Sequence, residues 1–284
     1  MSTFIDLPRR AAIGLVAGVW FASVAMSPES ANAQAVATTL DAVTVSSVAS
    51  RQPVEKSYDR ILQGQALFER LKARHAPDAE LRYRLLPRRP DAGLEGVELF
   101  ILGRDIEQRI TVAADHTFRI DPLPVDRTAG AQVTVLDRAA LTVTWRTDVR
   151  SPGVPQGMRR LGDLRVECEV GLESGLVSNV RSILDEISQA LTRPGFCLRN
   201  PARYYFFAER PLFKVTLVNG THRHVLPADE LYAGLTRDPR VVEELAYCDC
   251  EVLLDRTYFL PLGDASWPDD TLVSFDYMDA AESP

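Results

Sequence analysis

The chain has 284 residues and a formal net charge of −7 at pH 7. Acidic and basic residues are interspersed without a basic stripe, which argues against a nucleic-acid partner. A chain of this length can form one large domain or two smaller ones, each with its own hydrophobic core.

Residues 1–33 have the organisation of a signal peptide. Arg9 and Arg10 form a positive n-region, residues 11–26 are an apolar run, and Ala31-Asn32-Ala33 is a small-x-small cleavage site. The apolar run is shorter than the roughly 20 residues that a membrane span needs, although an uncleaved anchor is the alternative. We therefore expect export, a periplasmic or secreted location, and no integral membrane span after cleavage.

Residues 34–56 are small and polar and predict a flexible linker. Within the linker, residues 39–45 read Thr-Leu-Asp-Ala-Val-Thr-Val and resemble the TonB box of TonB-dependent outer-membrane receptors. In those receptors the segment pairs with TonB as an added strand. Nothing downstream resembles a plug domain, so the linker interpretation is preferred.

Residues 57–75 predict an amphipathic helix that Ser57 can cap and Pro77 ends. From Leu81 onwards, short apolar segments separated by turn signals predict the strands of an antiparallel β-sandwich. The helix and the sandwich together form an expected first domain, residues 57–171. Its expected strands are residues 81–86, 97–102, 106–112, 117–120, 132–136 and 141–149.

The last strand of this domain is expected at residues 164–170, where apolar and charged residues alternate. Leu164, Val166, Cys168 and Val170 fall on one side of such a strand. This period of two is typical of a half-buried strand, and it places Cys168 on the inner face.

Residues 97–120 resemble the carboxypeptidase-regulatory, transthyretin-like β-sandwich, in which strands continue through an Ala-Asp-x-x-Phe motif. The motif here is Ala114-Asp115-His116-Thr117-Phe118, with His116 where glycine is more usual. Most of the chain after Glu80 also resembles an uncharacterised family of secreted proteobacterial proteins, a resemblance that implies a fold and export but no activity. The motifs that carry it are Ser151-Pro152-Gly153, Leu161-Gly162-Asp163-Leu164-Arg165, Glu167-Cys168-Glu169 and Ser266-Trp267-Pro268-Asp269-Asp270.

Residues 172–284 are expected to form a second α+β or β-rich domain with one clear helix, residues 176–191. Asn219-Gly220 predicts a two-residue hairpin loop between strands at residues 213–218 and 221–226. The fold class is therefore mostly β (α+β). Further expected elements are a helix at residues 229–235 or 239–245 and strands near residues 247–254, 258–260 and 272–275.

All four cysteines, Cys168, Cys197, Cys248 and Cys250, lie in the second half of the chain. Export would place them in an oxidising compartment, where four cysteines allow three pairings. A disulfide between Cys168 and Cys197 is preferred, because it closes a segment that contains one expected helix.

A metal site is the alternative use of the remaining pair. With Asn219-Gly220 as the loop, Leu217 would face His222 and Val215 would face His224, so both imidazoles would lie on the apolar side. Together with Cys248 and Cys250 they would form a tetrahedral set for zinc or copper. We favour a disulfide and two hydrogen-bonded histidines over this site.

No catalytic signature is present: the chain has no nucleophile elbow, zinc-protease helix, phosphate-binding glycine loop or Rossmann fingerprint. An acidic loop around Trp267, with Asp264, Asp269 and Asp270, could bind a sugar or calcium, but a solvated loop with a buried tryptophan is preferred. The sequence therefore predicts an exported, non-enzymatic binding or structural module without a cofactor, contacting an envelope protein partner. Metal binding is the alternative function.

Overall fold

The computed structural model describes residues 55–89, 92–124, 128–135, 142–176, 195–199, 204–232 and 253–278. These residues belong to one compact unit, Ala49–Pro284. Within these ranges no helix is both long enough and apolar enough to cross a membrane. The helix expected at residues 176–191 lies outside the described residues except for Leu176, as does the alternative at 239–245, and of the alternative at 229–235 only residues 229–232 are described.

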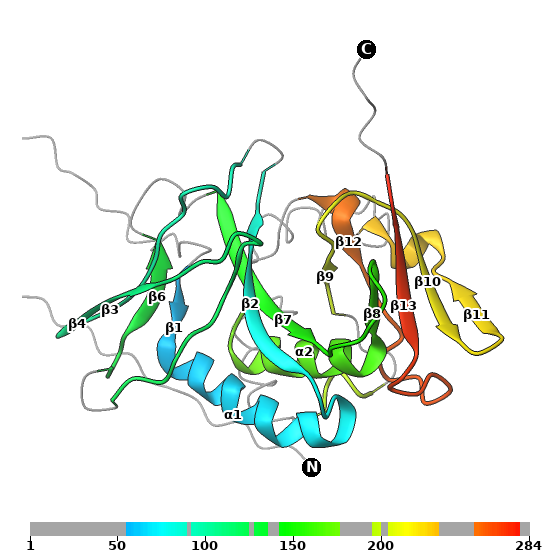
Figure 1. Ribbon diagram of the computed structural model, residues 1–284, viewed down its shortest axis with the longest axis horizontal. Helices are drawn as coiled ribbons and strands as arrows, with labels where there is room; N and C mark the ends of the chain where they lie inside the picture. Colours follow the sequence, from blue (N-terminus) through cyan, green and yellow to red (C-terminus); the bar gives the residue numbers. More distant parts are fainter. Residues whose placement is uncertain are drawn as a thin grey trace, which may run out of the picture. The chain divides into compact units, whose positions relative to one another are not determined.

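The fold is mostly β, and the strands of every described sheet pair antiparallel, as expected (Figure 1). The first sheet has the order β1 (Lys56–Ser57), β6 (Gln132–Val135), β3 (Leu99–Gly103) and β4 (Ile106–Ile110). The second sheet has the order β5 (Thr117–Phe118), β2 (Glu80–Pro87) and β7 (Val143–Arg150). The strands β2 to β7 coincide with segments that the sequence predicted, to within a few residues at either end, whereas β1 was not predicted and begins at the end of the expected linker.

These two sheets share one hydrophobic core. Leu99 and Ile101 of β3 and Val133 of β6 belong to the same buried cluster as Tyr83 of β2 and Trp145 of β7. The Tyr83 and Trp145 rings meet edge to face, with centroids 5.4 Å apart. This arrangement, in which alternate side chains of two sheets fill one core, is consistent with the predicted β-sandwich.

The predicted first helix is confirmed as α1 (Tyr58–His75). The Ser57 side chain caps it by accepting a hydrogen bond from the Arg60 backbone amide. Buried Ile61 and Phe68 form part of the face that packs on the protein. The helix therefore follows from local signals in its own sequence.

The C-terminal half forms a third sheet with the order β11 (His222–Val225), β10 (Leu212–Asn219), β13 (Leu272–Tyr277) and β8 (Met158–Arg160). A two-stranded sheet pairs β12 (Thr257–Tyr258) with β9 (Phe206–Phe207). The described residues also include the short 3-10 helices Ala228–Glu230 and Leu254–Arg256. Val215 and Leu217 of β10 and Val273 of β13 lie in a second buried core.

The strand expected at residues 164–170 is wrong, because this segment is part of helix α2 (Leu161–Glu173). Every residue from Leu161 to Gly171 is buried, including four charged ones. A helix buried on all sides has no polar stripe to reveal its period of 3.6, and here the charged residues happen to recur at every second position. The domain boundary expected after Gly171 therefore falls inside a helix.

Helix α2 packs against α1 and β7 and contributes to both halves of the fold (Figure 1). Leu164 and Cys168 belong to the C-terminal core, while Val166 and Val170 pack with Phe68 of α1. The two halves of the fold are thus built around one shared helix.

Close contacts fix the position of α2 at both of its ends. The Arg60 guanidinium of α1 donates hydrogen bonds to the carbonyl oxygens of Leu172 (3.1 Å) and Glu173 (3.3 Å) at its C-terminus. At its N-terminus, a Cβ added to Gly162 would overlap the carbonyl oxygen of His75. Only glycine allows the backbone of α1 to approach this closely.

Candidate functional site

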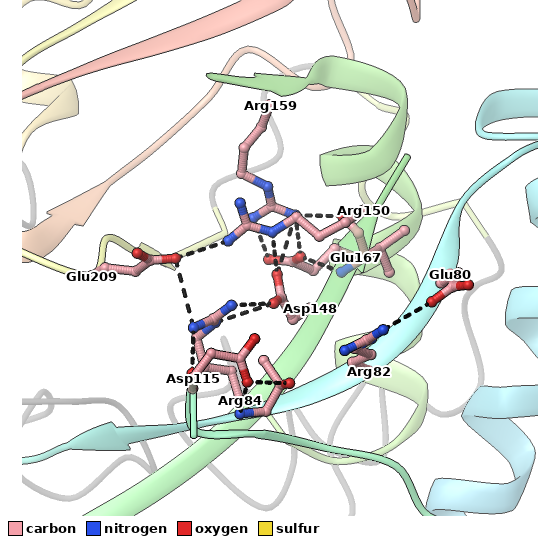
Figure 2. Close-up of polar contacts among 11 residues, drawn as sticks. Glu80, Arg82, Arg84, Asp115, Asp148, Arg150, Arg159, Glu167 and Glu209 are labelled. Atoms are coloured by element: carbon pink, nitrogen blue, oxygen red, sulfur yellow. Dashed lines mark hydrogen bonds and ion pairs between the residues drawn. The ribbon is translucent and has the colours of Figure 1, made fainter. Parts of the chain in front are cut away.

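A cluster of charged side chains, buried at its centre and exposed at its rim, lies where the two halves of the fold meet (Figure 2). Alternation along β2 and β7 directs Tyr83 and Trp145 into the sandwich core and the even-numbered residues to the opposite face. That face lies beside residues 204–209 and contacts groups from β8 and α2. We call this set the junction cluster, and its members are Arg84, Asp148, Arg150, Arg159, Glu167 and Glu209.

Asp148 is at the centre of the junction cluster and its side chain is only 5% exposed. It accepts hydrogen bonds from Arg84 Nη2 (2.9 Å), Arg84 Nε (3.1 Å) and Arg150 Nε (2.7 Å), while Arg159 Nη2 lies 3.9 Å away. Burial would raise the pKa of this carboxyl, but the nearby guanidiniums of Arg150, Arg159 and Arg84 outweigh it and lower the pKa from 3.8 to about 2. Asp148 is therefore held in its ionised form.

Arg159 and Glu167 form the second buried ion pair. Arg159 Nη2 lies 2.6 Å from Glu167 Oε2 and also donates to the Val149 carbonyl oxygen at 2.7 Å. Glu167 in turn accepts a hydrogen bond from the Val149 backbone amide at 3.0 Å. Burial opposes the charge on Arg159, but Glu167 and Asp148 more than compensate and raise the pKa of Arg159.

Glu209 completes the junction cluster from the segment after β9. Its Oε1 accepts a hydrogen bond from Arg150 Nη2 at 3.1 Å and lies 3.7 Å from Arg84 Nη1. Three guanidiniums thus balance three carboxylates. Each carboxylate of the cluster contacts a guanidinium from another segment, so the cluster joins separate segments of the fold.

The charged residues of α2 each bind a different segment. Asp163 accepts hydrogen bonds from the Ser151 amide (2.8 Å) and hydroxyl (2.7 Å), and Glu167 binds the β7 backbone. Arg165 points to the other side of the helix, because residues two apart are about 200° apart around its axis. It donates to the carbonyl oxygens of Leu262 (2.8 Å), Asp264 (3.2 Å) and Trp267 (2.8 Å) and to Asp269 Oδ1 (2.6 Å).

Glu169 and the disulfide fix a further segment to α2. Cys168 is bonded to Cys197, the pair preferred from the sequence, with Cα atoms 6.1 Å apart. The adjacent Glu169 carboxylate accepts hydrogen bonds from the amides of Cys197 (2.8 Å) and Gly195 (3.2 Å). Burial raises the pKa of Glu169 despite these hydrogen bonds.

The histidine hairpin forms, but its loop is Gly220-Thr221 and not Asn219-Gly220, and its pairs are shifted accordingly. Asn219 pairs with His222, and Leu217 pairs with His224. The histidines share a strand face with buried Leu217, yet every residue of β11 is exposed. Both histidines therefore lie on the expected face of the hairpin, but they are exposed because β11 lies at the edge of its sheet.

The two imidazoles contact Trp267. His222 stacks on the indole with centroids 4.0 Å apart and planes 8° apart, and the His224 centroid is 6.3 Å from it. Cys248 and Cys250 lie outside the described residues. Among the residues that are described, no group of three or more His, Cys, Asp and Glu side chains is arranged to hold a metal ion.

The carboxylates of the acidic loop serve the loop and its neighbours. Asp269 binds Arg165 and lies 2.9 Å from His75 Nδ1, and Asp270 accepts a hydrogen bond from Asn219 at 3.1 Å. Asp264 accepts one from the Ser266 amide. Trp267 is only 4% exposed, as the preferred interpretation expected.

Two clefts that were not predicted from the sequence lie beside the edge strand β4. The first, of about 390 Å³, opens between β4 and β5, and the second, of about 490 Å³, lies beside residues 94–98. Arg109, Ile110, Thr111 and Ala113 line both clefts and therefore form the wall between them. Cavities of this size are typical of binding sites.

The first cleft combines apolar and basic groups. Ile101, Ile110 and Phe118 are buried or nearly so and form apolar parts of its lining. Three arginines and one carboxylate line it, and these arginines are paired with Glu80 and Glu98 outside the lining. The charged residues of the lining are Arg82, Arg109, Arg119 and Asp121.

The junction cluster and the clefts were not predicted because their residues come from separate parts of the sequence. The alternating charges at Arg82 and Arg84, and at Arg146, Asp148 and Arg150, were the one local signal of a charged strand face.

No family profile, curated protein or solved structure matches this chain.

Proposed function

We propose that the protein is an exported, non-enzymatic module of the cell envelope that binds a protein partner through the β4 edge. The observation that carries this proposal is the pair of clefts on either side of an exposed edge strand. Glu107, Gln108 and Arg109 in the middle of β4 are all exposed. Among the described strands, β4 pairs only with β3, so the backbone groups on its other side can bind a partner.

The interior chemistry supports a structural use of the charged residues. Asp148 and Glu167 are each bound by arginines, and the charges of α2 bind backbone groups of separate segments. These interactions hold the scaffold that presents the β4 edge.

The location is part of the same proposal. A buried disulfide between Cys168 and Cys197 is compatible with an oxidising compartment, and residues 1–33 have the features of a signal peptide. We therefore assign the protein to the periplasm or the extracellular space. Intact-mass analysis of the exported fraction, without reductant, tests both cleavage after Ala33 and the disulfide.

Site-specific photocrosslinking in the native envelope tests the partner. A photoreactive residue at Gln108 should form a discrete adduct with an envelope protein. The matched control is Arg223, which is exposed on β11, the edge strand of another sheet. An adduct from position 223 alone, or none from either position, would overturn the proposal.

A further inference from the structure

We infer that β4 accepts an extended polypeptide segment as an added strand, and that this segment places an apolar and an acidic side chain, two residues apart, in the cleft between β4 and β5. This inference rests on the proposed function and specifies the chemistry of the partner. Strand addition draws affinity from main-chain hydrogen bonds and specificity from pockets for alternate side chains.

The β3–β4 register shows which backbone groups of β4 are open. Gly103 pairs with Ile106 across the two-residue link Arg104-Asp105. These two residues therefore close a hairpin, and their backbone groups hydrogen-bond to each other. Because antiparallel pairs alternate, Glu107 and Arg109 direct their amides and carbonyls away from β3. These groups lie on the outer edge, where both residues are exposed.

The first cleft lies on the inner face of the same edge. Gln108 pairs with Ile101, so it lies on the face of β4 that looks towards the core, yet it is exposed because the sandwich is open here. An added strand would direct every second side chain towards this face. Apolar lining residues, including Ile101 and Phe118, would accept an apolar side chain.

The arginines favour an acidic neighbour for that side chain. Arg82 and Arg119 already bind a carboxylate, that of Glu80, at 3.3 Å and 2.5 Å. Glu80 is half exposed and does not line the cleft, whereas both arginines do. An acidic side chain two residues from the apolar one would lie on the same face and compete with Glu80 for these arginines, whereas a basic one would be repelled by them.

The length of the edge favours a peptide over a small anion. β4 offers five residues of strand, and the two clefts extend the lined surface along residues 109–113. A small amphiphilic anion would use the arginines and the apolar floor but none of the backbone groups of Glu107 and Arg109. Its binding would therefore be insensitive to a change that removes only an outward amide.

The test is a selection from a display library of random peptides about six residues long, the usual length of a strand. Wild-type protein should enrich peptides with an apolar and an acidic residue two positions apart. Glu107→Pro should reduce their affinity at least about tenfold by removing an outward amide, while the matched Glu107→Gln variant should bind like wild type. Thermal unfolding of both variants verifies that β4 still forms.

A charge swap tests the side-chain contact. Arg119→Glu, at a half-exposed position, should lower the affinity for the enriched peptides. Replacing the acidic residue of the peptide by lysine should restore the affinity of this variant. Decanoate, a small amphiphilic anion, is used as a competitor of the enriched peptides. The inference is overturned if no peptide is enriched or if Glu107→Pro binds the peptides as tightly as Glu107→Gln. It is also overturned if decanoate binds Glu107→Pro and Glu107→Gln equally and competes equally with the peptides in both variants. If crosslinking at Gln108 persists in that case, the proposed function stands and only strand addition is refuted.

Discussion

Replacing Asp148 by asparagine should destabilise the protein by about 2 kcal/mol at neutral pH. The change keeps the shape of the side chain but removes the charge that the surrounding guanidiniums stabilise. In the folded protein the pKa of Asp148 falls from 3.8 to about 2, and each pKa unit corresponds to about 1.4 kcal/mol. The side chain is 5% exposed, so solvent screening reduces this contribution little.

The same shift sets the pH dependence of stability. Because the folded-state pKa of Asp148 is depressed, the unfolded state binds more protons between the two values. The contribution of Asp148 is therefore complete above 3.8 and is lost as pH falls towards about 2. Asp148→Asn should lack this contribution, so its unfolding free energy should approach that of wild type as the pH falls through this window.

Urea unfolding followed by tryptophan fluorescence measures both effects, at neutral pH and at several values through the acid range. Glu69→Gln serves as the control, because this glutamate is 68% exposed in an ion pair with Lys72 and should change stability by less than about 0.5 kcal/mol. If Asp148→Asn were as stable as wild type at neutral pH and kept the same acid slope, the reasoning about the junction cluster would be refuted.

Three further substitutions test how α2 is held. Gly162→Ala should destabilise the protein by about 2 kcal/mol, seen as a lower Tm, because its Cβ would overlap the carbonyl oxygen of His75; an unchanged Tm would show that the helices can separate freely. Glu169→Gln keeps an oxygen acceptor but has no charge to bury. As pH rises from 4.5 through the raised pKa of Glu169, the wild type should therefore lose stability that the variant keeps. Urea midpoints that change with pH in parallel for the two proteins would contradict this. Replacing Cys168 and Cys197 together by alanine should cost about 3 kcal/mol in urea unfolding, and equal midpoints for the oxidised and substituted proteins would show that the disulfide is dispensable.

The sequence was sufficient wherever the determining interactions are local. Ser57 and the apolar spacing after it predicted α1, and alternation with turn residues predicted the strands from β2 to β7. The pairing of Cys168 with Cys197 followed from the short segment between them. In each case a residue and its neighbours in sequence carry enough free energy to select one backbone conformation.

The histidine hairpin marks the limit of local inference. The Asn219-Gly220 signal found the right hairpin, but the loop moved by one residue. The exposure of His222 and His224 depends on the position of β11 at the edge of its sheet among the described strands. A hairpin signal specifies that the chain turns. It does not specify whether the resulting strand lies at the centre or at the edge of a sheet.

Helix α2 was decided by the tertiary structure. Arg165, Glu167 and Glu169 suggested a solvated strand face, yet all three are buried and bind partners up to 104 residues away in the sequence. A charged side chain in the interior is stable only when such partners surround it, because it has lost its water. Those partners are assembled by folding, so the alternation in sequence could not distinguish a strand that faces solvent from a helix at the centre of the molecule.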